Sequence, residues 1–154
     1  MKRILVSACL LGEKCRYDGT SRECLHPIFA KWRSEGRLIA ICPEVCGGLP
    51  VPRPPCELRG GKALSCGGED FTAQYLAGAQ AAVMRARECG AALCILKENS
   101  PSCGVNRVYD GTFSGRLISG QGLCAQLLRQ AGFAAFSENE LEAAQELLSR
   151  TEGK

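Results

Sequence analysis

Short continuous apolar runs recur along the chain, separated by segments in which apolar residues repeat every three or four positions. The runs are typical of buried strands, and the repeats are typical of helices with one apolar face. The runs predict strands over 4–8, 37–41, 92–97 and 133–136. The repeats predict helices within 25–36, 75–90, 123–132 and 137–148. This alternation predicts an α/β fold, with a parallel central sheet of about four strands and helices on both faces.

Two polar segments interrupt the alternation. Residues 43–68 are dense in proline and glycine, which predicts a long loop of mostly irregular structure at the carboxyl edge of the sheet. Residues 98–120 are also rich in glycine, and residues 109–112 have the composition of a hairpin turn. The sequence has no internal repeat and no visible domain boundary, so we expect a single α/β domain over 1–154.

Composition narrows the class of protein. The chain has 154 residues, 45% of them hydrophobic and 23% charged, which is ordinary for one globular domain. The net charge of +3 comes from scattered residues, which argues against a nucleic-acid partner. No apolar run approaches the roughly 20 residues of a membrane span, so we expect no membrane association. The apolar run at 4–8 is too short for a secretory signal, which predicts a cytoplasmic protein with reduced thiols.

Three of the eleven cysteines follow three different predicted strands. Cys9, Cys42 and Cys103 each come just past a strand, and the carboxyl ends of parallel strands share one edge. We therefore expect the three thiols to meet, and three thiolates without a fourth partner would hold an iron–sulfur cluster with one iron left open. The alternative is that each is a small buried hydrophobe. Cys15 and Cys46 lie near the same edge, and either one is able to replace a ligand.

Other metal and redox motifs are missing from the sequence. No Cys-x-x-Cys pair is present, which argues against a zinc ribbon and a thioredoxin-type site. His26 is the single histidine, and its position predicts a helix start without a catalytic role. We interpret a further group of cysteines as core residues: Cys24, Cys66, Cys89, Cys94 and Cys124.

Glu44 is the acidic residue closest to these thiols in the sequence, two positions after Cys42. A carboxylate beside a metal cluster is able to move protons or to position water. The alternative interpretation is that Glu44 only neutralises Arg16 or Arg53.

Hydroxyl groups surround the third thiol. Ser100 and Ser102 flank Pro101 immediately before Cys103, where they would donate hydrogen bonds to a substrate or to cluster sulfur, or simply form a turn. Lys97 is a weaker candidate of the same kind.

Three ordered motifs resemble the signature of the bacterial 2-thiouracil desulfidase family. They are VSACLLG followed by RYDG, then CPEV followed by GGL and PR, then SPSCG followed by YDGTF. The resemblance covers nearly the whole chain.

The resemblance implies an enzyme with a 4Fe-4S cluster held by Cys9, Cys42 and Cys103, with one iron not bound by the protein. It also implies non-redox removal of sulfur from a thiolated pyrimidine, giving uracil and sulfide. By motif, Glu44 and Ser100 would be the catalytic pair.

Alternatives remain open at this point. If the chain is an enzyme, its substrate would be a thiolated pyrimidine, another thiolated metabolite or a tRNA base. The other alternative is a metal-binding or redox-sensing module that catalyses no reaction. Several cysteines match no motif position and leave room for a different substrate or an added metal site: Cys24, Cys56, Cys66 and Cys124. The oligomeric state is not predicted.

Overall fold

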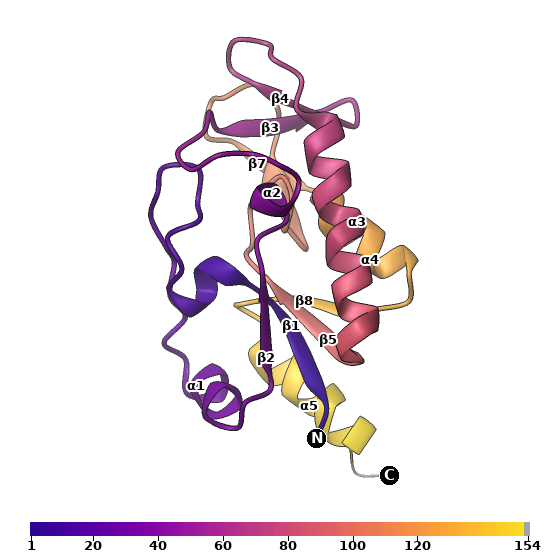
Figure 1. Ribbon diagram of the computed structural model, residues 1–154. Helices are drawn as coiled ribbons and strands as arrows, with labels where there is room; N and C mark the ends of the chain where they lie inside the picture. The colour runs from indigo at the N-terminus through magenta and orange to yellow at the C-terminus, as the bar shows by residue number, and fades with distance from the viewer. Residues whose placement is uncertain (153–154) are drawn as a thin grey trace.

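The central sheet has four parallel strands, as Figure 1 shows for the computed structural model, which describes residues 1–152. In spatial order they are β2 (Leu38–Ile41), β1 (Arg3–Ser7), β5 (Ala91–Leu96) and β8 (Ala135–Ser137). The two inner strands, β1 and β5, pair directly, with Leu5 opposite Cys94. Both faces of these strands are covered, which explains their continuous apolar sequence. The predicted α/β fold with a parallel four-stranded sheet is confirmed.

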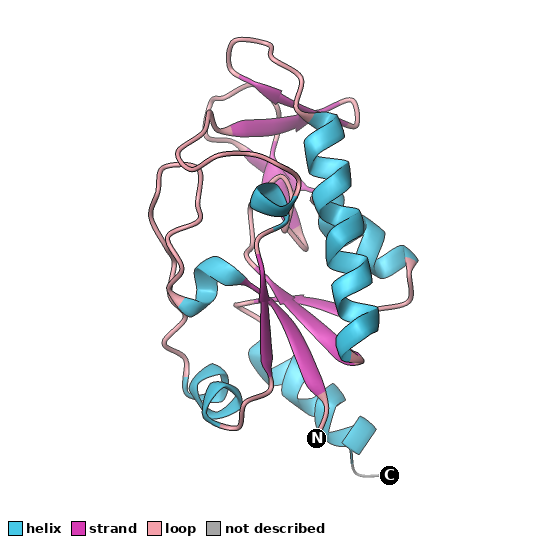
Figure 2. Ribbon diagram, in the orientation of Figure 1, coloured by secondary structure: helices cyan, strands magenta, loops and turns pink. Residues whose placement is uncertain are grey.

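Helices cover both faces of the sheet (Figure 2). On one face, α3 (Thr72–Cys89) and α4 (Leu123–Gln130) pack against alternate strand residues such as Leu5 and Leu96. On the other face, α1 (Pro27–Ser34) and α5 (Leu141–Glu152) pack against the intervening residues, including Ile4 and Ile95. Successive strand residues point to opposite faces, so each short apolar run feeds two separate cores.

Helix ends follow the local chemistry of the sequence. His26 precedes α1, and its Nδ1 accepts a hydrogen bond from the backbone N–H of Ile28 at 3.1 Å. The predicted place of His26 at a helix start is therefore confirmed. Before α5, the Glu140 carboxylate accepts from the backbone N–H of Ser137 at 2.9 Å, as expected for a capping box.

More than half of 43–68 is irregular, as expected, but the segment also contains regular elements that the sequence did not predict. This segment holds a short helix, α2 (Pro43–Cys46), and a hairpin of β3 (Cys56–Arg59) and β4 (Lys62–Ser65). Gly60 and Gly61 form the two-residue connection, with φ values of 58° and 80°. Two consecutive positive φ angles suit the tight turn that matches strand twist, and glycine adopts them without a steric penalty.

A second hairpin lies in the other polar segment. It pairs β6 (Arg107–Tyr109) with β7 (Leu117–Ser119), in the region where the sequence predicts a hairpin turn. A 3-10 helix, η1 (Ala8–Leu11), follows β1 directly. Together with α2 and the β3–β4 hairpin, these elements stand above the carboxyl ends of the strands in Figure 1. Of the helices in residues 1–152, none has the length and apolar character needed to cross a bilayer.

Two glycines bring α2 against α3 at backbone distance. A Cβ placed on Gly78 of α3 would lie 1.8 Å from the carbonyl oxygen of Pro43. A Cβ placed on Gly47, which follows α2, would lie 1.9 Å from the carbonyl oxygen of Gln74. Any side chain at either position would push the two helices apart, so these glycines fix where α2 sits.

Candidate active site

A pocket of about 560 Å³ opens at the carboxyl end of the central sheet. Its volume falls in the range of small-molecule sites, roughly 300–1,000 Å³. The walls come from the ends of β1, β2 and β5, from α2, and from the β3–β4 and β6–β7 hairpins. Five thiols line it, those of Cys9, Cys15, Cys42, Cys56 and Cys103.

The three cysteines singled out from the sequence meet in this pocket. Cys9 lies in η1 after β1, Cys42 is the residue before α2, and Cys103 lies in the loop after β5. Burial, together with the neighbouring thiols of Cys103 and Cys42, raises the pKa of Cys9 to about 12. This mutual influence means that the three sulfur atoms are close enough for a charge on one to disfavour a charge on the next.

Cys15 is a fourth thiol beside Cys42. The Cys42 thiol donates to the backbone carbonyl of Cys15 at 3.7 Å. The neighbouring Cys15 thiol and the backbone N–H of Val45 lower the pKa of Cys42 to about 7, against the effect of burial. Cys46 differs, because it is exposed and lines an adjoining depression, which Cys15 and Cys42 also line. Of the two alternative ligands left open by the sequence, the pocket contains Cys15 and not Cys46.

The thiol set fits an iron–sulfur cluster better than a single ion. Within residues 1–152, no three His, Cys, Asp or Glu side chains are grouped tightly enough to hold one metal ion. A lone zinc with bonds of 2.3 Å would need sulfur atoms about 3.8 Å apart. A cluster spreads its thiolate ligands over several iron atoms, so it requires thiols around a shared cavity and not in mutual contact. Cys9, Cys42 and Cys103 meet that requirement.

Glu44 lines the same pocket and is held by two donors. Its Oε1 accepts from Arg53 Nε at 2.9 Å and from the Tyr75 hydroxyl at 2.9 Å. The Arg53 side chain is 3% exposed and also donates to the backbone carbonyl of Cys15 at 2.8 Å. The expected pairing of Glu44 with Arg53 is present, yet both hydrogen bonds fall on Oε1. Oε2 accepts no hydrogen bond within residues 1–152, which leaves it free to accept one from a ligand.

The two serines have different surroundings. Ser100 lines the pocket, and its Oγ accepts from the backbone N–H groups of Ser102 and Cys103 at 3.1 and 3.0 Å. Its own hydroxyl proton remains available to a ligand. Ser102 is 1% exposed, does not line the pocket, and has no hydrogen-bond partner for its hydroxyl within residues 1–152. A substrate contact through Ser102 stays a prediction without geometric support.

Lys97 lines the pocket but is already engaged. Its ammonium lies 2.9 Å from the Glu138 carboxylate and donates to the backbone carbonyl of Glu98 at 3.0 Å. These contacts fix its position at the end of β5. A substrate-binding role for Lys97 stays a prediction.

Several residues around the pocket escaped the sequence analysis. Tyr75 lies in α3 among apolar residues at helical spacing, which is typical of a core residue. Its hydroxyl nevertheless donates to Glu44. Glu98 accepts hydrogen bonds from the backbone N–H groups of Val105, Asn106 and Arg107, and so shapes the loop that carries Cys103. Phe113 lines the pocket in a left-handed conformation with φ of 58°, held by a hydrogen bond from its N–H to Glu57. No spacing rule in the sequence marks these contacts.

The fold and the pocket together define an α/β protein with a cavity of small-molecule size that five thiols line. Comparison with known families identifies it further, because the 2-thiouracil desulfurase family model matches residues 4–140. The chain belongs to this family, which confirms the resemblance seen in the motifs.

Two relatives support the assignment. A solved structure of the 4Fe-4S-dependent thiouracil desulfidase TudS is 43% identical, with a TM-score of 0.95, covering 97% of this chain and 99% of that one. The Bacillus subtilis (strain 168) protein described as "Uncharacterized protein YbbK" is 44% identical over an alignment of 151 residues, and the match covers 90% of this chain and 97% of that protein.

Proposed function

We propose that this protein removes sulfur from a thiolated pyrimidine such as 2-thiouracil, by non-redox hydrolysis that yields uracil and sulfide. The observation that carries the proposal is the gathering of Cys9, Cys42 and Cys103 in one pocket with Glu44. The similarity to a desulfidase that depends on a 4Fe-4S cluster supports the same chemistry here.

Cys9, Cys42 and Cys103 would hold a 4Fe-4S cluster as three thiolates. When bound, the cluster supplies an iron atom without a protein ligand, which is a Lewis acid suited to a soft thiocarbonyl sulfur. Each thiol gives up its proton on ligation, which Cys42, with its pKa of about 7, does most readily.

Glu44 is the base in this proposal. Arg53 and Tyr75 hold Oε1, so Oε2 would accept a proton from the water that attacks the carbon bonded to sulfur. Two donors on one oxygen also prevent the carboxylate from rotating, which keeps the water at a fixed distance from the ring.

Ser100 and Lys97 act on the substrate ring. The Ser100 hydroxyl would donate to a ring oxygen or nitrogen, because its acceptor capacity is already used by two backbone N–H groups. Lys97 would contribute positive charge near the anionic product. We also propose a cytoplasmic enzyme acting on a small molecule, which agrees with eleven free cysteines in the structure.

The ligand set is tested by anaerobic reconstitution with iron and sulfide. We expect a visible absorbance band from thiolate-bound iron and about four iron atoms per chain. Cys103→Ala is expected to lose most of this iron, whereas Cys46→Ala, at an exposed cysteine outside the pocket, retains it. An unchanged spectrum in Cys103→Ala would remove Cys103 from the ligand set. Zinc without acid-labile sulfide in protein purified without air would favour a metal-binding module.

The base is tested with Glu44→Gln, which keeps the size and the hydrogen bonds to Oε1. We expect the reconstituted variant to keep its iron and its absorbance, while sulfide release falls about 10²- to 10⁴-fold. Sulfide is measured colorimetrically and uracil by chromatography. Full turnover by this variant would refute the role of Glu44.

A further inference from the structure

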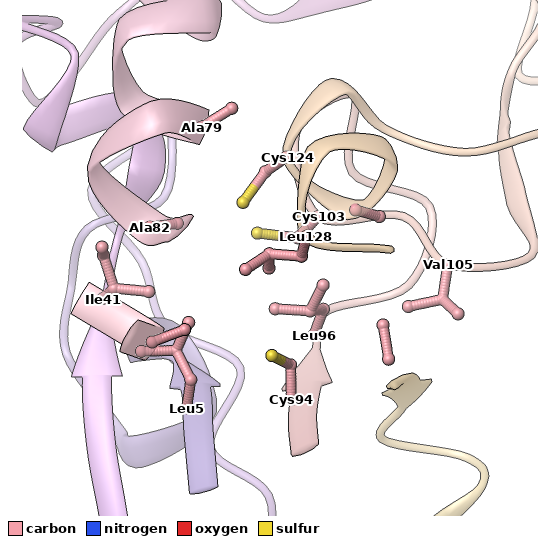
Figure 3. Close-up of a cluster of buried hydrophobic side chains, with 13 residues drawn as sticks. Leu5, Ile41, Ala79, Ala82, Cys94, Leu96, Cys103, Val105, Cys124 and Leu128 are labelled. Atoms are coloured by element: carbon pink, nitrogen blue, oxygen red, sulfur yellow. The ribbon is translucent and has the colours of Figure 1, made fainter. Parts of the chain in front are cut away.

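Cys124 lies against Cys103 at the start of α4, and Figure 3 shows the two sulfur atoms facing each other. The two thiols are neighbours in the same cluster of buried residues. Their backbones are adjacent as well, because the N–H of Cys124 donates at 2.9 Å to the carbonyl of Ser102, the residue that precedes Cys103. A disulfide needs Cα atoms roughly 4.4–6.8 Å apart. One hydrogen bond between neighbouring backbone groups is compatible with that separation.

The close approach depends on Gly122. A Cβ at this position would lie 2.3 Å from the carbonyl oxygen of Ser102 and 2.9 Å from the backbone nitrogen of Cys103. The first turn of α4 therefore rests directly on the loop of Cys103, which places the two thiols side by side.

The two thiols differ in their access to solvent. Cys103 is 5% exposed and lines the pocket, whereas Cys124 is 0% exposed and does not line it. A small oxidant that enters the pocket would reach Cys103 first. Cys124 is then the thiol already in contact with the oxidised sulfur.

We propose that Cys124 is the resolving partner of Cys103, and that the pair forms a disulfide when a peroxide enters the pocket of the cluster-free protein. The Cys103 sulfur attacks a peroxide oxygen, the O–O bond breaks, and the thiol proton passes to the departing oxygen, so that water leaves and the sulfur is oxidised to sulfenic acid. The Cys124 thiol then attacks that sulfur, the S–O bond breaks, and water leaves. Two thiols and one hydrogen peroxide give one disulfide and two waters.

The disulfide would preserve a cluster ligand. Sulfenic acid that meets no thiol is oxidised further to sulfinic acid, which thiol reductants do not reverse. A disulfide returns to two thiols on reduction, so the protein would regain its capacity to bind iron. This part of the inference rests on the proposed role of Cys103 as a ligand, while the disulfide itself does not.

Peptide mapping tests the pairing directly. Trypsin would release Cys103 in residues 98–107 and Cys124 in residues 117–129, and each peptide contains a single cysteine. Cluster-free protein is treated with hydrogen peroxide, its remaining thiols are blocked, and the digest is analysed by mass spectrometry. We expect these two peptides joined, with two hydrogen atoms lost. Cys103 joined to residues 4–14, which carry Cys9, or Cys103 found as sulfinic acid, would overturn the proposal.

Two variants distinguish a role of Cys124 in forming the disulfide from a role in packing the buried cluster. Cys124→Ser is expected to bind iron normally before oxidation, but after peroxide and reductant it loses most of its iron uptake and carries sulfinic acid at Cys103. Cys94→Ala, a substitution in the same buried cluster, is expected to keep the disulfide and full recovery. Recovery in Cys124→Ser equal to wild type would overturn the protective role.

Repeating the peroxide treatment with bound cluster distinguishes failure of this proposal from failure of the proposed function. If bound cluster does not slow formation of the disulfide, Cys103 is not a ligand, although the resolving pair stands. If bound cluster protects Cys103 but no disulfide forms in the cluster-free protein, the ligand stands and the resolving pair is wrong.

Discussion

Gly78→Ala tests whether the contact between α2 and α3 positions Glu44. The added Cβ would lie 1.8 Å from the Pro43 carbonyl oxygen, whereas ordinary contacts begin at 3.4 Å. Relief requires α2 to retreat by about 1.6 Å, the difference between those distances. Glu44 moves with α2 while Tyr75 stays on α3, so their hydrogen bond of 2.9 Å is lost.

Two magnitudes follow from this displacement. In a helix interior, Gly→Ala normally stabilises by about 1 kcal/mol, but forced overpacking costs about 1–3 kcal/mol. We expect the cost to exceed the gain, with a net loss of stability of up to about 2 kcal/mol. Misplacing a reacting group by about 1 Å costs on the order of 10²-fold in rate, so sulfide release should fall by that factor.

The assays are urea unfolding of the cluster-free protein and sulfide release by the reconstituted enzyme. Ala77→Gly is the matched control, because it lowers helix propensity by about 1 kcal/mol at an exposed neighbour without touching α2. It should lose similar stability and keep its activity. A Gly78→Ala protein as stable and as active as wild type would refute the positioning argument.

Two further predictions concern the groups that hold the site. Tyr75→Phe removes a donor to the Glu44 carboxylate, so we expect about 1.5–3 kcal/mol less stability in urea unfolding and a lower kcat with little change in KM; an unchanged kcat would contradict it. The second prediction concerns Glu98. Burial raises the pKa of its carboxyl group, but hydrogen bonds from Asn106, Arg107 and Val105 outweigh burial and lower that pKa from 4.5. Its contribution to stability is therefore full above pH 4.5 and lost as the pH falls through the lower folded value, and Glu98→Gln should flatten that loss in acid unfolding curves. An equally steep loss in the variant would exclude Glu98 as the source.

The sequence predicted the sheet well because burial on both faces leaves a strong signal. The runs containing Leu5 and Ile95 are apolar at successive positions over 4–6 and 91–96, and their order along the chain limits the sheet to few arrangements. The meeting of Cys9, Cys42 and Cys103 followed from the same rule, since it depends on strand ends and not on side-chain detail.

The hairpin in 43–68 and the clamp on Glu44 did not follow from the sequence. Gly60 and Gly61 were visible as glycines, but the strands beside them are short and only partly buried, so their periodicity was weak. The clamp joins Arg53, Tyr75 and Glu44 across a tertiary contact between α2 and α3. This contact depends on Gly47 and Gly78, which let the two helix backbones touch. The spacing of apolar and polar residues along the chain does not predict it.

The docking of α4 on the loop of Cys103 has a consequence for assembly. Backbone N–H groups from Gly122 to Ala125 donate to the carbonyls of Pro101, Ser102 and Gly104, so the first turn of the helix is capped by the loop itself. Loop and helix must then open together, and the third thiol is held in place before any iron arrives. Slow deuterium uptake at these amides in the cluster-free protein would show that the loop of Cys103 is already folded and does not have to fold when the cluster binds.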